Sequence, residues 1–88
     1  MKFHLSDDVI HQPVLEEVVL LNLKSQQYYS LDDVGSRMWN LLLEHRDLDV
    51  VSSILLTEYD VDRNRLRTDL EILVGELAQA GILVISST

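Results

Sequence analysis

The chain has 88 residues, 47% of them hydrophobic, and its 15 acidic and 7 basic residues give a formal net charge of −8. This length fits one small domain, residues 1–88, and leaves no room for a second. The chain has no cysteine, which excludes disulfides and thiolate chemistry. No stretch resembles a signal peptide or approaches the ~20 apolar residues of a membrane span, so we expect a cytoplasmic protein without membrane contact.

The first third of the chain has the pattern of a small antiparallel sheet. Residues 7–12 contain a short apolar segment, and Pro13 suits a sheet edge or a break after it. Residues 17–23 are rich in Val and Leu, residues 24–26 are polar and turn-like, and residues 27–31 form the return strand. The sequence therefore predicts a hairpin, although it lacks the Asn-Gly or Asp-Gly pair that would define the turn type.

A helix of about three turns is predicted next. Asp32 and Asp33 fit its N-cap and first turn, because carboxylates accept the free backbone N–H groups there and favour the positive end of the helix dipole. Apolar residues follow at helical spacing. This predicted face consists of Val34, Met38, Leu41, Leu42 and His45, with Trp39 beside it.

Two further helices are predicted in the second half. Asp49 is a good cap for the first of them, which ends near Tyr59, and either Asp60 or Asp62 caps the last and longest helix. The predicted buried face of the first is Val50, Val51, Ile54 and Leu55. That of the second is Leu66, Leu70, Leu73, Val74 and Leu77.

Two glycines and a final apolar run complete the pattern. Gly75 lies inside the last predicted helix, where glycine costs about 1 kcal/mol against alanine, so we expect close packing there. Gly81 suits the left-handed residue that ends a helix, and residues 82–85 have the composition of a short strand. Three strands followed by three helices predict an α+β fold of the winged helix-turn-helix type, with a small three-stranded antiparallel sheet.

The sequence offers no clear catalytic or metal-binding cluster. His4, His11 and His45 are scattered without metal-ligand spacing. Neighbouring acidic pairs do not share a face and are explained by helix caps and strand ends. The serines lack a histidine at fixed spacing, and the three glycines are too far apart for a phosphate loop. We therefore expect a protein that is not an enzyme and holds no metal or cofactor.

Three of the seven basic residues gather near the start of the last predicted helix. Arg63 and Arg67 share one side, whereas Arg65 lies on another side with Asp69. One explanation is a set of ion pairs, Arg65–Asp69 and Arg67–Glu71, worth a few tenths of a kcal/mol each. The other is a recognition helix, for which the acidic surroundings disfavour DNA as the target.

The run "VVLLNLKSQQYYSLDDVGSRMWNLL" (18–42) resembles the PqqD-like family, the leader-peptide recognition elements of ribosomal peptide natural-product (RiPP) pathways. The shared features are an apolar strand, a short turn, a strand ending in Leu-Asp, and a helix with Gly35 and a Met-Trp pair. A later match is "TEYDV" followed by "DLEILVGELAQAGIL", so the resemblance covers about residues 9–85. The order and spacing of these motifs are specific, although no single motif is.

Within that family the Tyr-Tyr pair and the stand-alone size are most similar to lasso-peptide members. Such proteins bind the leader of a precursor peptide and present it to a separate cysteine protease, the leader peptidase, with a macrocyclase as a further partner. The quinone-cofactor branch usually has a Pro-Gly-type turn and a Cys-Asp-Gly-like stretch, where this chain has "LKSQQ" and "LEHRD". Another RiPP pathway remains an alternative.

The resemblance implies that the leader adds as a strand to residues 27–31, against the third helix. Because Leu31 is expected to turn inward, alternation places Tyr29 inward and Tyr28 outward, and we predict that Tyr28 lines the leader groove. Arg67 and Glu71 are the candidates for polar selectivity. The predicted peptide-binding residues are Gln27, Tyr28, Tyr29, Ser30, Leu31, Leu66, Arg67, Leu70, Glu71 and Val74, of which Leu70 and Val74 are more in keeping with the core.

Two other classes of function remain open. A winged-helix regulator would use the three arginines on DNA, yet the acidic balance repels a nucleic-acid backbone, so we expect no nucleic-acid partner. An accessory subunit would bind a protein partner without any leader contact. The exposed edge strand also invites self-pairing, so we expect a monomer or a weak dimer.

Overall fold

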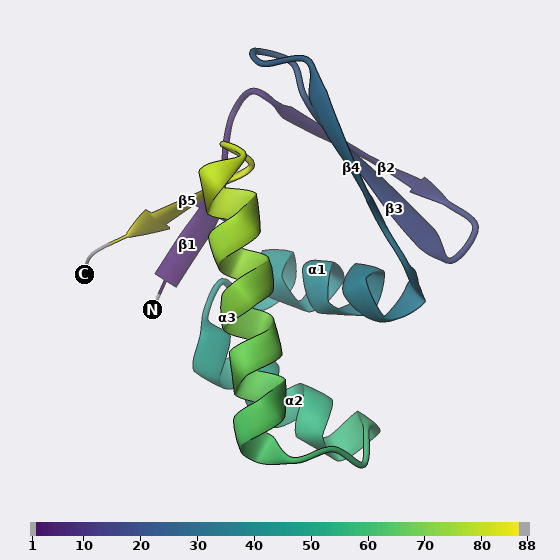
Figure 1. The fold of residues 1–88 in the computed structure, drawn as a ribbon, viewed down its shortest axis with the longest axis vertical. Helices are drawn as coiled ribbons and strands as arrows, with labels where there is room; N and C mark the ends of the chain where they lie inside the picture. The colour runs from purple at the N-terminus through teal and green to yellow at the C-terminus, as the bar shows by residue number, and fades with distance from the viewer. Residues whose placement is uncertain (1, 87–88) are drawn as a thin grey trace.

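The computed structural model describes residues 2–86 and confirms the predicted α+β class. A three-stranded antiparallel sheet precedes three helices, as expected (Figure 1). The elements in chain order are β1 (Lys2–Leu5), β2 (Val9–Val14), β3 (Glu17–Asn22), β4 (Gln27–Leu31), α1 (Asp33–His45), α2 (Leu48–Glu58), α3 (Arg63–Gln79) and β5 (Leu83–Ser86).

The strands form two separate antiparallel sheets. One has the order β2-β3-β4, and the other joins β1 to β5, the two ends of the described chain. The short final strand is confirmed, but β1 was not predicted. Its four residues alternate Phe3 and Leu5 with polar neighbours, and Phe3 is buried when β5 pairs with the strand.

Aspartates cap all three helices, as predicted, although one cap is a different residue. Asp32 caps α1 and Asp62 caps α3, each accepting the backbone N–H of the residue three positions later. The prediction of Asp49 as the second cap is wrong, because Asp47 caps α2 and accepts the backbone N–H of Asp49 at 2.9 Å. The helix therefore begins earlier, at Leu48, whose side chain is buried.

This earlier start changes the buried face of α2. The buried residues of α2 are Leu48, Val51, Ser52 and Leu55, the i, i+3, i+4, i+7 pattern counted from Leu48. Val50, predicted to be buried, is instead 43% exposed.

The two glycines of the C-terminal region differ in their surroundings. Gly81 has φ +75° after α3, which confirms the predicted left-handed position. The expectation of close packing at Gly75 is wrong, because a Cβ added there would meet nothing within 4 Å on this exposed side of α3.

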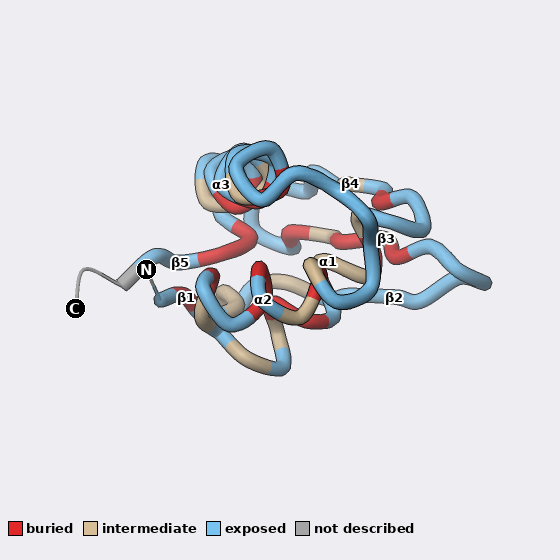
Figure 2. Tube along the Cα trace, turned by 90° about the horizontal axis from the view of Figure 1, so that it is seen from below, coloured by how far each residue is buried: buried red, intermediate tan, exposed pale blue. Residues whose placement is uncertain are grey.

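One hydrophobic core joins the sheet and the helices. Helix α1 lies against β3 and β4, and α3 packs on α2 and β5. Figure 2 shows buried stretches of β3, α1 and α3 in the interior, with exposed segments around them. The largest fully buried side chains are Trp39, Leu20, Leu42, Leu48, Leu55, Leu70, Leu77, Ile82, Val51 and Val74. Across residues 2–86, none of the helices has the length and apolar character needed to cross a membrane.

Candidate functional site

Strand β4 is an edge strand whose far side has no strand partner among the described residues. It pairs only with β3, with Leu20 opposite Tyr29 and Leu21 opposite Tyr28. In an antiparallel sheet, alternate residues of an edge strand direct their backbone N–H and C=O groups away from the neighbouring strand. The strand Gln27–Leu31 contains no proline, so each of its residues keeps its N–H donor.

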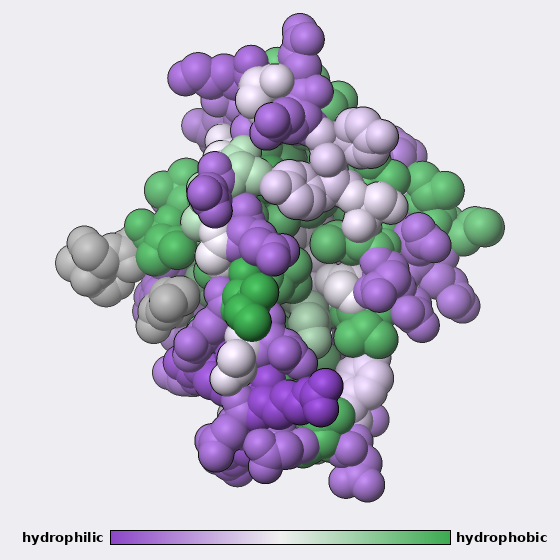
Figure 3. All heavy atoms as spheres, viewed as in Figure 1, coloured by the Kyte–Doolittle hydropathy of each residue, from purple (hydrophilic) through white to green (hydrophobic). Residues whose placement is uncertain are grey.

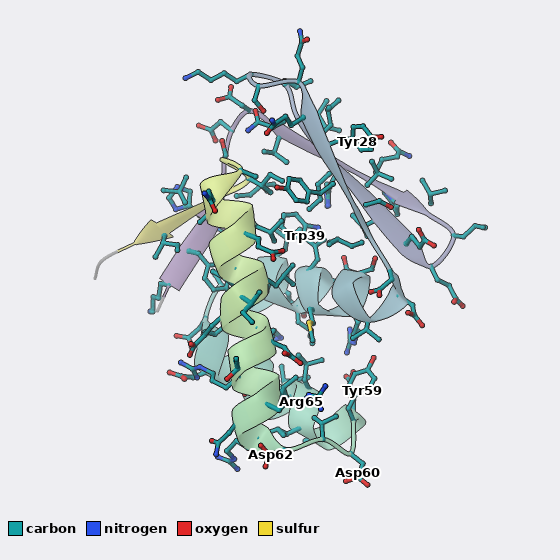
Figure 4. All side chains as sticks on the ribbon, viewed as in Figure 1. Tyr28, Trp39, Tyr59, Asp60, Asp62 and Arg65 are labelled. Carbon is teal, nitrogen blue, oxygen red and sulfur yellow. The ribbon has the colours of Figure 1, made fainter. Side chains whose placement is uncertain are left out.

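The two neighbouring tyrosines lie on opposite faces of the sheet, as predicted. Tyr28 is 71% exposed and stands in one cross-strand row with Leu21 and Ile10 on the outer face. Figure 4 shows that Tyr28 projects from the side of β4 that is turned away from α3. Tyr29 is half-buried and packs against the hydrophobic core. It is therefore Tyr29, not Tyr28, that belongs to the helix-facing side of the sheet.

The helix-facing row of the sheet rests on the single tryptophan of the chain. His11, Leu20 and Tyr29 are opposite one another on β2, β3 and β4. Trp39 of α1 is fully buried below them, and its Nε1 donates to Nδ1 of His11 at 3.4 Å. In the view of Figure 4, Trp39 lies between α3 and β4. The helix-facing side of the sheet thus packs on a core that contains Trp39 and Leu20, with Tyr29 partly buried against it.

One flank of α3 is turned toward α2. Arg67 forms ion pairs with Asp49 at the start of α2 and with Glu71 one turn along α3, the latter at 3.0 Å between Nε and Oε1. The guanidinium of Arg67 holds the pKa of the Asp49 carboxyl below its usual value, and the two carboxylates, Asp49 first, raise the pKa of Arg67. The predicted pair Arg67–Glu71 is confirmed, and this flank is occupied by contacts within the protein.

The opposite flank of α3 is turned toward the start of α1, directly after β4. Arg65 and Asp69 border an apolar pocket of about 230 Å³, whose other lining residues are Val34, Met38, Tyr59, Val61 and Leu66. Figure 4 shows Arg65 on the same side of α3 as Tyr59. Leu73 follows Asp69 by four residues and so shares this flank. The predicted ion pair Arg65–Asp69 is not formed among the described residues.

We call the free edge of β4 together with Arg65, Asp69 and Leu73 the β4–α3 face. Figures 1 and 2 place β4 and α3 on the same side of the molecule. In the space-filling view, hydrophobic residues are visible in the middle of this face, between the mainly hydrophilic spheres of α3 and the sheet (Figure 3). Beside the turn that precedes β4, a shallow depression of about 420 Å³ is lined by residues 26–29.

The predicted site residues fall into three groups. Residues 27–31 form β4 itself. Leu66, Leu70 and Val74 are at most 5% exposed, which confirms Leu70 and Val74 as core residues. Arg67 and Glu71 lie on the flank that faces α2, so the structure does not bring them together with β4.

Sequence reasoning did not include Arg65, Asp69 and Leu73 among the candidate site residues. Helical spacing already placed Arg65 and Asp69 on one side of α3. It carried no signal for which side faces the sheet, because that depends on how α3 packs on α2 and β5. Among residues 2–86, no group of three or more His, Asp or Glu side chains could hold a metal ion.

Comparisons with known proteins identify the family of this chain and two similar structures. The family described as coenzyme PQQ synthesis protein D (PqqD) matches residues 17–83. A structure described as TbiB1 in complex with the TbiA(beta) leader peptide is 35% identical, covering 97% of this chain and 99% of that chain with a TM-score of 0.89. A lasso peptide synthetase B1 complexed with the leader peptide is 26% identical, covering 97% and 100% with a TM-score of 0.87. A search of curated proteins found no match. The sequence match and the shared architecture therefore show that this chain belongs to the PqqD family.

Proposed function

We propose that this protein binds the leader region of a ribosomally made precursor peptide in lasso-peptide biosynthesis. The leader adds as a fourth strand to the free edge of β4 and lies against α3. The observation that carries the proposal is a proline-free edge strand whose far side has no strand partner within residues 2–86, in a chain similar to two proteins whose structures contain a leader peptide. The predicted mode of strand addition is retained, with the β4–α3 face as the site.

Strand addition suits the chemistry of this face. Main-chain hydrogen bonds to β4 supply affinity with little dependence on the leader sequence, and alternate leader side chains supply selectivity. Those that point toward the helices meet Tyr29 and Leu73, and those that point outward meet Tyr28 and Ser30. Because a disordered leader loses conformational entropy on binding, we expect a Kd on the order of micromolar to tens of nanomolar.

The bound leader would then be presented to a separate leader peptidase and to other maturation enzymes. The outer face of the sheet supports this part of the proposal. Ile10 is 49% exposed and Tyr28 71% exposed, with Leu21 between them, and a strand added to β4 would leave this row uncovered. An enzyme docking there would contact the row and the outward leader side chains together, and could thus distinguish the loaded protein from the free one.

A fluorescence-anisotropy titration tests leader binding. The probe is the labelled leader of the short precursor encoded beside the gene, with a scrambled leader and a random DNA duplex in parallel. We expect saturable binding of the leader alone. Absence of leader binding together with salt-sensitive DNA binding would replace the proposal with a DNA-binding regulator. Absence of leader binding together with co-purification of a maturation enzyme would leave an accessory subunit.

A further inference from the structure

The hairpin β3–β4 and helix α3 are joined by a single hydrogen bond among the described residues. Nδ2 of Asn22 donates to the backbone oxygen of Ala80 at 3.0 Å, across 58 positions of sequence. Asn22 ends β3 and is opposite Gln27, the first residue of β4. Its side chain is only 6% exposed, in a sheet whose other buried side chains are apolar. A buried amide at this junction therefore has a specific partner on α3.

The other half of the same side chain holds the hairpin turn. Oδ1 of Asn22 accepts the backbone N–H groups of Lys24 at 3.0 Å and Ser25 at 3.2 Å. The backbone oxygen of Asn22 also accepts the N–H of Gln26 at 2.7 Å, so the turn closes around this residue. A single planar amide thus connects the turn before β4 with the end of α3.

The end of α3 is built to receive this amide. Ala80 is the C-cap residue, and the last carbonyls of a helix lack partners within the helix. Gly81 follows at φ +75°, and a Cβ at this position would lie 2.9 Å from Nδ2 of Asn22. Glycine therefore serves both the left-handed backbone and the close approach of the Asn22 side chain.

We infer that Asn22 is a positioning residue that fixes the distance between the edge of β4 and α3. The lower end of β4 is held independently, because it continues into α1 and the Ser36 hydroxyl donates to the Leu31 oxygen at 3.1 Å. The upper end of β4, at Gln27, depends on the Asn22–Ala80 contact. Asn22 thereby determines the width of the β4–α3 face, and its effect on leader affinity rests on the function proposed above.

Two substitutions separate this role from that of holding the turn. Asn22→Asp keeps an oxygen that accepts the turn N–H groups, but it loses the donor to Ala80 and places a carboxylate against that carbonyl. Gly81→Ala disturbs the same contact from the α3 side. The matched control is Arg37→Gln, which removes an ion pair between α1 and α2, Arg37–Glu58, far from this contact. Circular dichroism identifies the temperature range in which all variants are folded.

A distance measurement without any ligand tests the positioning role. The chain has no cysteine, so spin labels at Gln27→Cys, at the upper end of β4, and at Glu76→Cys in α3 report this one separation by electron–electron resonance. We expect a narrow distance distribution in the parent and in Arg37→Gln, and a broadened one in Asn22→Asp and Gly81→Ala. A distribution that stays unchanged in Asn22→Asp would overturn the inference.

Leader titration of the same variants, without the labels, tests the consequence. The probe is the leader peptide of the neighbouring precursor. We expect Asn22→Asp and Gly81→Ala to raise the leader Kd about 5- to 20-fold. Arg37→Gln should change this Kd less than about twofold. Each factor of ten in Kd corresponds to about 1.4 kcal/mol of binding free energy. A broadened distance distribution with an unchanged Kd would overturn the role in binding. If the parent binds no leader, the proposed function fails, and the distance measurement alone still decides whether Asn22 positions β4.

Discussion

The three-stranded sheet has two edges, and they differ in their capacity to accept another strand. Edge strand β2 contains Pro13, which has no N–H donor, and nearly all of its residues are exposed. Edge strand β4 keeps all of its donors and lies on the same side of the molecule as α3. Both strands pair with β3, so the difference lies in their composition and surroundings and not in the sheet topology.

This contrast supports β4 as the edge for the proposed strand addition. Proteins commonly protect exposed edge strands with proline or charge, because an open edge templates unwanted pairing. Here β2 is interrupted by proline, whereas β4 is left open beside an apolar surface bordered by Arg65 and Asp69. An open edge beside a second contact surface is the arrangement expected for a strand-adding peptide.

The largest expected effect comes from a matched pair of residues on the two edges. Tyr29 and His11 both flank Leu20 on the helix-facing side, one on β4 and one on β2. We expect Tyr29→Ala to weaken leader binding about tenfold or more, because an aromatic contact with the added strand is lost. His11→Ala should change the Kd less than about twofold. Isothermal titration calorimetry of both folded variants measures the leader Kd. Equal increases in Kd would mean that the leader does not distinguish the two edges of the sheet.

A second pair of variants compares two sides of α3. Leu73 is half-buried on the flank assigned to the β4–α3 face, and Ile72 is 54% exposed on another side of the helix. We expect Leu73→Ala to raise the leader Kd about three- to tenfold and Ile72→Ala to leave it unchanged, since only the first removes apolar surface from the site. Leader titration would contradict the assignment of the flank if Ile72→Ala had the larger effect.

Tyr28→Ala should have a smaller effect on the leader than Tyr29→Ala. Tyr28 projects to the outer face and would contact only the outward side chains of the proposed leader strand, so we expect a change in Kd of about two- to threefold. Fluorescence anisotropy with the labelled leader measures this change. A loss as large as that of Tyr29→Ala would show that the bound strand relies on the outer face.

The smallest expected effect is on stability and comes from the ion pairs between neighbouring helices. Arg67 lowers the pKa of Asp49, and Arg37 lowers the pKa of Glu58, so both carboxyls bind protons less readily in the folded state. Their contribution to stability is complete above the usual carboxyl pKa of about 4 and is lost as the pH falls through the lowered values. Exposure and salt keep the contribution small.

Thermal unfolding between about pH 6 and pH 2 measures this contribution. We expect Arg67→Gln to reduce the acid-induced fall in Tm slightly and to leave the leader Kd at neutral pH unchanged. A leader Kd that rose markedly in this variant would return Arg67 to the peptide site, as the sequence first suggested.

Much of the fold could be predicted because its signals are local. The apolar strands, the polar turn at residues 24–26 and the aspartate caps each depend on a few neighbouring residues. The alternation of Tyr28 and Tyr29 followed from Leu31 alone. These features defined the edge strand and its two faces.

The features that the sequence did not predict depend on contacts between segments that are distant in the chain. Strand β1 exists because β5 pairs with it, and the choice of Asp47 over Asp49 follows from the burial of Leu48. Helical spacing divided α3 into two flanks but did not show which one faces β4. The contact of Asn22 with Ala80 crosses 58 positions and has no local signature.

Hydrogen exchange of the backbone amides, with and without leader peptide, would show whether a leader strand pairs with β4. An added strand would bond the outward amides of β4 and slow their exchange. We expect new protection within residues 27–31 and none at the free edge of β2, residues 9–14. Protection of β2 alone, or saturable binding with no change in β4, would contradict strand addition at this edge.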